Sequence, residues 1–137
     1  MKPRTLRRRL RTEAFVALAI ARLAVRLVPA KRLLAWAARR PRQPQRFADP
    51  GLPAEIAAAV DFVGSSRFMP AKCLPRALAT QAMLRRRGIA SRLCLGVARD
   101  GRSLLAHAWV EIGRGQIIIG EVDDNHDQEF TRVAQFG

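Results

Sequence analysis

The sequence contains one pair of side chains suited to nucleophilic catalysis, a cysteine and a histidine. Cys73 opens the segment CLPRALATQAMLRRRG, in which apolar residues recur at helical spacing. Pro75 fits a helix only within the first turn, which predicts that Cys73 lies at or beside the N-cap. The N-terminal end of a helix carries about half a positive charge, and this charge stabilises the thiolate, the nucleophilic form of cysteine. The amides of the first turn would also donate hydrogen bonds to the oxyanion formed when a thiolate attacks a carbonyl.

The histidine and a carboxylate are predicted on a β-hairpin. The alternation of residues 103–112 indicates a strand that carries His107, and a second strand is predicted over 116–121. If the intervening GRG forms a three-residue loop, His107 faces Glu121, and facing residues lie on the same side of a sheet. A five-residue loop would place Asp123 there instead. Glu121 is therefore the first choice for a carboxylate that orients the imidazole, and Asp123 is the alternative.

Other reactive or polar side chains have simpler interpretations. Trp109 and Glu111 share the predicted face of His107, where each would either line the site or serve packing. Cys94 alternates with leucines on a predicted strand and is expected in the core. His126 stands in an acidic tail without partners at the spacing of metal ligands. The sequence therefore predicts no metal site and no cofactor.

Composition limits the class of protein. A chain of 137 residues fits one domain, and its two cysteines form no C-x-x-C pair, which favours a reducing cytoplasm over a disulfide or zinc scaffold. Residues 1–48 carry a net charge of +13, and residues 49–137 carry +1. We expect a basic helical N-terminal region over 1–48, packed on or extending from a core formed by 49–137.

The basic region is predicted to be helical over 10–28 and 30–39, before a proline-rich linker. Arg22 and Arg26 interrupt its apolar run, which makes it too short for a membrane span and a poor signal peptide. The sequence has no tyrosine, and its aromatic residues are not interleaved with the basic ones, which argues against nucleic-acid binding. Long basic side chains on an amphipathic helix could instead face water or bind a partner protein, an acidic peptide such as a leader segment, or anionic lipid. The sequence does not rank these.

Elements predicted in the core complete an α+β fold. Pro53 opens a helix, a strand is predicted over 89–97, and residues 99–102 form a turn before the strand of His107. The polar tail after residue 121 is expected to dock only through a few apolar side chains.

These motifs together resemble a known family, the transglutaminase-like cysteine proteases that remove the leader from lasso-peptide precursors. The matching stretches are CLPRALA, RRRGI, GV and HAWVE, within about residues 70–121. The resemblance implies a transglutaminase-like, papain-like core with N-terminal helices, a helix bearing the cysteine and a small antiparallel sheet. In the family a triad of cysteine, histidine and an acidic residue carries out the reaction. The matching residues here are Cys73, His107 and the acid of the Gly-Glu pair at 120–121. This sequence has Glu121 where the family usually has aspartate, with Asp123 close behind.

The resemblance also implies a biological role, namely the leader peptidase of lasso-peptide maturation, a branch of the ribosomal peptide (RiPP) pathways and of antibiotic biosynthesis. Its partners would be the lasso precursor peptide, a separate leader-recognition protein of winged-helix type and an asparagine-synthetase-like cyclase that uses ATP. The protein is then expected in the cytoplasm, with membrane-surface contact through the basic helices as one option. The residues expected to contact substrate lie in the cysteine and histidine motifs: Arg76, Trp109 and Glu111.

Two alternatives remain open from the sequence. The same triad could transfer an acyl group to an amine in place of water. The chain could also be a non-catalytic basic domain that binds peptide or nucleic acid, whose binding would fall steeply with salt.

Overall fold

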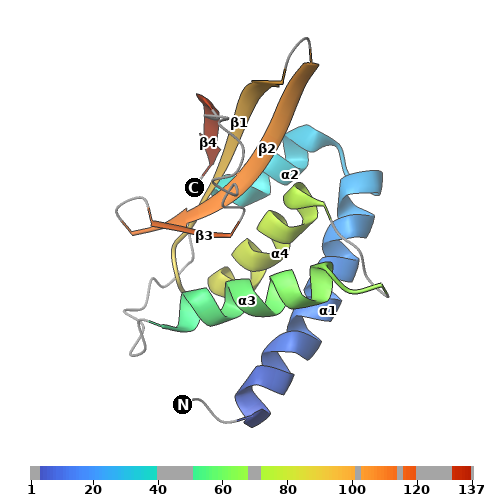
Figure 1. Cartoon of the computed structure of the whole chain (residues 1–137), viewed down its shortest axis with the longest axis vertical. Helices are drawn as coiled ribbons and strands as arrows, with labels where there is room; N and C mark the ends of the chain where they lie inside the picture. Colours follow the sequence, from blue (N-terminus) through green and yellow to red (C-terminus); the bar gives the residue numbers. More distant parts are fainter. Residues whose placement is uncertain are drawn as a thin grey trace.

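A computed structural model describes residues 4–39, 51–67, 72–100, 103–113, 116–119 and 131–136. In these ranges the helices are α1 (Arg4–Leu27), α2 (Ala30–Ala38), α3 (Leu52–Gly64) and α4 (Cys73–Arg86). The strands are β1 (Arg92–Asp100), β2 (Ser103–Ile112), β3 (Gln116–Ile119) and β4 (Thr131–Phe136). The helices form one layer and the strands form the other (Figure 1), so the predicted α+β fold is confirmed.

The ends of the helices follow proline and glycine in the sequence. Pro29 separates α1 from α2, and Pro53 lies in the first turn of α3. After α4, Gly88 takes a positive φ of 73°, as expected for a left-handed helix stop. The start of α1 differs from the prediction, because the helix begins at Arg4 and not at residue 10. Arginine is a good helix former, so the basic segment extends the helix without needing an apolar face.

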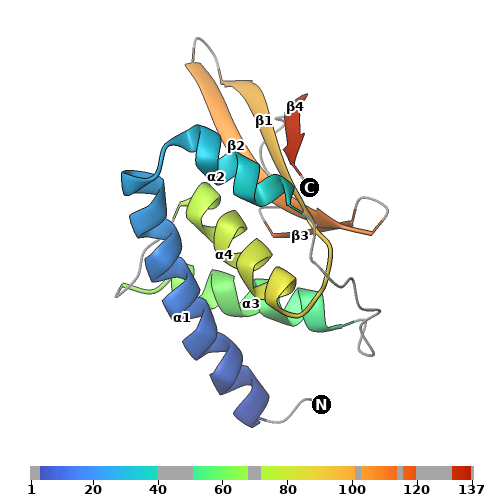
Figure 2. The ribbon, with the colours of Figure 1, turned by 180° about the vertical axis from the view of Figure 1, so that it is seen from behind.

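The long helix α1 packs against α3 and α4. Its buried side chains are spaced three or four residues apart and belong to the common hydrophobic core: Leu10, Ala14, Leu18 and Ala21. Two of these are alanines, which let the helices approach closely. Figure 2 shows α1 running along the outside of the molecule, with α3 and α4 on its inner side. None of the described helices combines the length and the apolar character that a bilayer crossing requires.

An ion pair joins α1 to the end of α4. The guanidinium of Arg87 holds both carboxylate oxygens of Glu13, with Nη1–Oε1 and Nη2–Oε2 distances of 2.8 and 2.6 Å. These hydrogen bonds lower the pKa of Glu13 below its ordinary value, and they raise the pKa of Arg87. Such two-pronged, charge-assisted bonds are among the stronger polar contacts in proteins. The pair therefore fixes the basic N-terminal helix against the helix that begins with Cys73.

A second arginine of α4 anchors α2. Arg85 donates to the carbonyl oxygens of Trp36 (2.8 Å) and Ala37 (3.3 Å), and also to that of Arg39. Its guanidinium carbon lies 4.2 Å from the centre of the Trp36 ring. Carbonyl groups at the end of a helix have no partner within the helix, so this side chain satisfies them and holds α2 on the core.

The sheet has the strand order β3-β2-β1-β4 and is antiparallel throughout. Leu93 of β1 faces Val110 of β2, and both side chains are buried in the core beneath the helices. Ala108 and Ile112 lie on the same face of β2, since side chains alternate along a strand. The helix α4 packs directly on β2. This contact places the cysteine-bearing helix against the strand that carries the histidine.

Three features of the sheet differ from the prediction. β1 begins at Arg92, not at residue 89, because Ile89 still donates to the Leu84 carbonyl and packs in the core. Arg99 and Asp100, predicted in a turn, pair with β2. The strand β4 was not predicted at all, because its partner β1 lies more than thirty residues away in sequence, and local pattern carries little information on such pairing.

Candidate active site

Cys73 is the first residue of α4. The preceding Lys72 has an extended backbone (φ −77°, ψ 178°), and Pro75 is buried in the first turn, where its missing N–H breaks no helical bond. The first turn contains no acidic residue that would offset the positive end of the helix. The Cys73 side chain packs against the hydrophobic core but remains partly exposed. The thiol thus meets the two conditions set by its predicted role, a helix N-terminus and access from solvent.

Arg76 fixes this end of α4 to the end of α3. It donates to the Gly64 carbonyl (3.0 Å), to Ser65 Oγ (3.4 Å) and to Asp61 Oδ1 (3.3 Å). Gly64 leaves room for this contact, since a Cβ there would lie 2.7 Å from Arg76 Nε and the guanidinium would have to shift. Burial raises the pKa of Asp61, against the opposing effect of Arg76. Arg76 therefore has a clear positioning contact, and its contact with substrate stays a prediction.

A row of interacting side chains runs along one face of β2. The rings of His107 and Trp109 are stacked, with centroids 6.1 Å apart and an interplanar angle of 21°. Trp109 Nε1 donates to Glu111 Oε1 at 3.0 Å, and Glu111 Oε2 lies 3.7 Å from Arg92 Nη2. Trp109 and Glu111 are almost fully buried, whereas His107 is partly exposed. The row gives the partly exposed His107 a neighbour that is itself held by a hydrogen bond.

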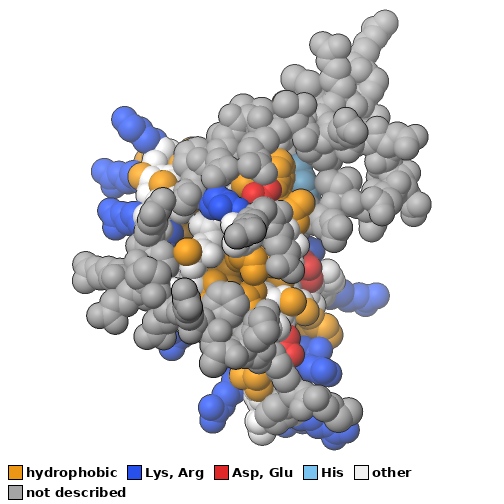
Figure 3. Space-filling model, turned by 90° about the vertical axis from the view of Figure 1, so that its left-hand side faces the viewer, with side chains coloured by type: hydrophobic (Ala, Val, Ile, Leu, Met, Phe, Trp, Pro, Cys, Tyr) orange, Lys and Arg blue, Asp and Glu red, His pale blue; other side chains and the backbone are white. Residues whose placement is uncertain are grey.

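The residue across from His107 on β1 is Gly96, which has no side chain to cover the ring. Cys94 faces Trp109 and is fully buried, which confirms that it is a core residue. Figure 3 shows a histidine at the surface of this side of the molecule, next to hydrophobic side chains. At this position, therefore, β1 presents no side chain to the imidazole.

The hairpin between β2 and β3 begins as predicted and then changes register. Ile112 pairs with Gln116 and Glu111 with Ile117, as a three-residue loop requires, and Gly113 has a positive φ of 56°. Between Glu111 and Val110 the register shifts by one residue. The geometric argument that placed Glu121 opposite His107 assumed a constant register, so it no longer distinguishes Glu121 from Asp123. Both carboxylates, and His126, lie outside the described residues.

The described contacts bring some predicted residues together and not others. His107, Trp109 and Glu111 form one connected row. Cys73, at the start of α4, packs instead against the hydrophobic core. His107 alternates along β2 with residues that face the helices. The described contacts include no hydrogen bond between Cys73 and His107. The link between them is the packing of α4 on β2.

Arg92 is the site residue that sequence reasoning missed. It lies opposite Glu111, and it donates to the Gly113 carbonyl at 2.8 Å. A signal was present in the sequence, because a turn was predicted between the two strands. If Asp100 pairs with Ser103 across that turn, the same register pairs Arg92 with Glu111.

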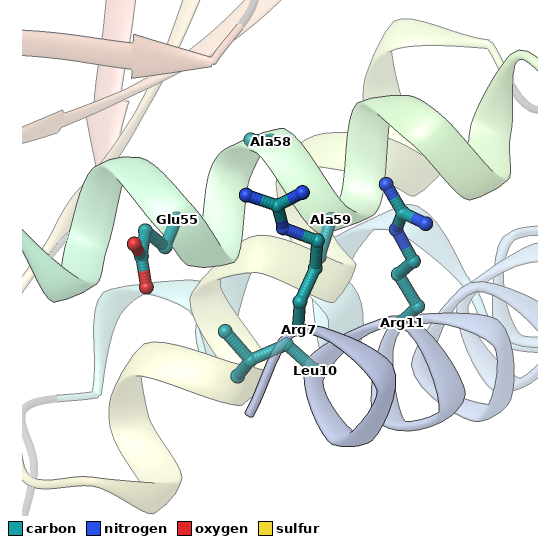
Figure 4. Close-up of a pocket in the computed structure, with 6 residues that line it drawn as sticks. All are labelled: Arg7, Leu10, Arg11, Glu55, Ala58 and Ala59. Atoms are coloured by element: carbon teal, nitrogen blue, oxygen red, sulfur yellow. The ribbon is translucent and has the colours of Figure 1, made fainter. Parts of the chain in front are cut away.

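Two grooves in the described part of the chain lie away from these residues. The first lies between α1 and α3 and has a volume of about 230 Å³. Figure 4 shows Arg7 and Arg11 reaching from α1 along α3, with Glu55 at the other end. The second groove lies between α1 and α2. Neither is lined by Cys73 or His107, and no three described His, Cys, Asp or Glu side chains lie close enough together to hold a metal ion.

Comparisons with known proteins place this arrangement in a family. The profile of the transglutaminase-like superfamily matches residues 14–135, which include both the basic helix α1 and the strand β4. Searches of curated proteins and of solved structures found no match. Because the family match spans most of the chain, the helix that begins with Cys73 and the strand of His107 are parts of one known fold. The protein belongs to the transglutaminase-like superfamily.

Proposed function

We propose that the protein is a cysteine peptidase that removes the leader from a lasso-peptide precursor. The observation that carries the proposal is the position of Cys73, partly exposed as the first residue of α4, on a helix that packs against the strand of His107. Membership of the transglutaminase-like superfamily supports thiol chemistry at this position. The motifs CLPRALA and HAWVE support the narrower assignment to leader removal.

The reaction begins when the Cys73 sulfur attacks the carbonyl carbon of the scissile bond. The thiol proton passes to the His107 imidazole, and the first-turn amides of α4 hold the oxyanion. Collapse of this intermediate breaks the C–N bond, and the imidazolium returns its proton to the leaving amine. Water, with His107 as base, then hydrolyses the thioester and frees Cys73.

Because His107 alternates along β2 with the residues that face α4, the reaction requires the imidazole to move to the Cys73 sulfur when substrate binds. Hydrogen bonds between catalytic groups are often long in the free enzyme and tighten when substrate is bound. A carboxylate, Glu121 or Asp123, would orient the imidazole and stabilise its charged form.

Incubation of the full chain with the precursor peptide and its recognition protein, followed by mass spectrometry, tests the proposal. We expect two fragments whose masses sum to precursor plus water. Cys73→Ala should abolish cleavage, and Cys94→Ala should retain it, because Cys94 is buried in the core. An added amine that appears bonded to the carbonyl fragment would instead identify an acyltransferase. An intact precursor, or cleavage unaffected by Cys73→Ala, would exclude the peptidase.

A further inference from the structure

The outer face of α1 carries apolar side chains that nothing in the described structure covers. Four of them lie in a line at spacings of four, three and four residues, which we call the outer stripe: Val16, Ile20, Leu23 and Leu27. Their exposed fractions are 52%, 63%, 58% and 71%. The opposite side of α1 is buried in the core, so the helix cannot rotate to hide the stripe. A continuous apolar line on a surface helix indicates an interaction site.

Arginines border the stripe on one side. Arg22 and Arg26 line a shallow groove together with Leu23. At the other end of α1 the arginines turn toward α3, where the Arg11 guanidinium lies 3.6 Å from the centre of the Phe62 ring. Glu13, the one acid of α1, is held by Arg87. The surroundings of the stripe are therefore positively charged, as is the N-terminal region as a whole.

The apolar surface continues from Ile20 into the groove between α1 and α2. This groove has a volume of about 360 Å³, and α4 supplies its floor through Leu78 and Ala82. Trp36 lies in its wall, beneath the Arg85 guanidinium. Apart from Trp36, only Arg32 in the lining has a polar side chain. Tryptophan is frequent where proteins meet the headgroup region of a bilayer.

Three kinds of ligand could cover this surface, namely a second copy of the chain, an extended peptide or lipid, and the chemistry of the surface favours one of them. A second copy of the chain would bring a like-charged region against it, which electrostatic repulsion opposes. An extended peptide would leave its backbone groups without hydrogen-bond partners in a groove lined mainly by alanine, leucine and valine. Acyl chains need no such partners, and the anionic headgroups above them complement the arginines.

We propose that α1 binds the surface of an anionic lipid bilayer. The outer stripe enters the boundary between headgroups and acyl chains, and Arg22, Arg26 and Arg32 contact lipid phosphates. Long arginine side chains can reach headgroups while their methylene stems cover apolar surface. The helix lies on the membrane and does not cross it, in accord with its many arginines and low overall hydrophobicity. The proposal is independent of the peptidase chemistry.

Sedimentation of the purified full chain with vesicles tests the proposal. We expect binding to vesicles of phosphatidylglycerol mixed with phosphatidylcholine to be at least about tenfold stronger than binding to phosphatidylcholine alone. The double variant Leu23→Ser and Leu27→Ser should weaken the first interaction by about tenfold or more, since both side chains leave the lipid. The double variant Arg22→Gln and Arg26→Gln should weaken it and reduce its salt dependence.

Ile117→Ser provides a matched control, because this side chain is also exposed (43%) but lies on β3. We expect it to bind vesicles as the unaltered chain does, and circular dichroism should show all variants folded. The proposal is overturned if the chain does not sediment with anionic vesicles, or if the leucine variant binds as well as the unaltered chain. Binding that is equal for charged and neutral vesicles also overturns it. Cleavage of a precursor in solution should not change in the leucine variant, which separates this test from that of the peptidase.

Discussion

Trp109 Nε1 donates a buried hydrogen bond of 3.0 Å to Glu111 Oε1, and the same indole ring stacks on His107. The HAWVE motif thus joins a partly exposed imidazole to a buried carboxylate through one aromatic side chain. The other carboxylate oxygen lies near Arg92 of the adjacent strand, so the row is fixed at both ends. A rigid neighbour reduces the number of orientations that the imidazole can adopt before substrate binds.

Replacing Glu111 should therefore alter both stability and catalysis. Glu111→Ala leaves the Trp109 N–H and the Arg92 guanidinium without this acceptor, and we expect the free energy of unfolding to fall by about 1–3 kcal/mol. Glu111→Gln retains an oxygen acceptor for Trp109 and should restore most of the activity lost in the alanine variant. Urea unfolding and the pH dependence of kcat measure the two effects. An alanine variant that is destabilised but has unchanged kcat at every pH would show that Glu111 serves packing alone.

Arg76 offers a test that separates positioning from substrate binding. Arg76→Lys keeps the positive charge but loses the planar fork that reaches two acceptors on α3 and one on its C-cap residue, Ser65. If the contact positions Cys73, the free energy of unfolding should fall by about 1–2 kcal/mol, and kcat should fall with little change in KM. Steady-state kinetics and urea unfolding provide both values. A raised KM with unchanged stability and kcat would instead assign Arg76 to the substrate.

The Glu13–Arg87 pair should contribute measurably to the docking of α1. In a double-mutant cycle with Glu13→Gln and Arg87→Gln, we expect a coupling energy of about 1–2 kcal/mol, because both partners are partly buried and form two short hydrogen bonds. Arg86 lies 3.5 Å from the same carboxylate but is largely exposed, so the cycle with Arg86→Gln is the control. Its coupling should be no more than a few tenths of a kcal/mol. Equal couplings in the two cycles would show that burial and geometry do not matter here.

The same pair predicts the response of stability to acid. Because the folded-state pKa of Glu13 is lowered, its contribution is complete above the ordinary value of 4.5 and is lost as the pH falls through the lowered value. Asp61 acts in the opposite direction, since its pKa is raised and its protonation favours the folded state. Thermal unfolding of Glu13→Gln should accordingly depend less on pH in the acid range than that of the unaltered chain. Parallel curves for the two proteins would refute the assignment.

The fold was predictable where local chemistry determines it. Proline and glycine mark the helix ends, and Pro75 alone places Cys73 at the start of α4. The alternation in β2 predicts its bounds, Ser103–Ile112, without error. The GRG loop predicts the pairs Ile112–Gln116 and Glu111–Ile117. Each of these features depends on residues only a few positions apart in sequence.

The rest of the fold and site depends on tertiary contacts that local pattern does not encode. The register shift at Val110, the pairing of β1 with β4 and the row from His107 to Arg92 each require a partner in another element. The outer face of α1 is a similar case, because the sequence shows apolar residues on the helix but not which of them the core covers. The choice between Glu121 and Asp123 as the triad acid stays a prediction for the same reason.

The central claim is that Cys73 and His107 act as one nucleophilic pair, and an electrophilic peptide probe tests it most directly. A peptide vinyl sulfone with the leader sequence should form a covalent adduct at Cys73, located by fragment mass spectrometry, and none at buried Cys94. Replacing His107 with alanine should slow adduct formation at least about a hundredfold, the usual contribution of a positioned base. Labelling that is equally fast without the imidazole, or that occurs elsewhere than Cys73, would contradict the account.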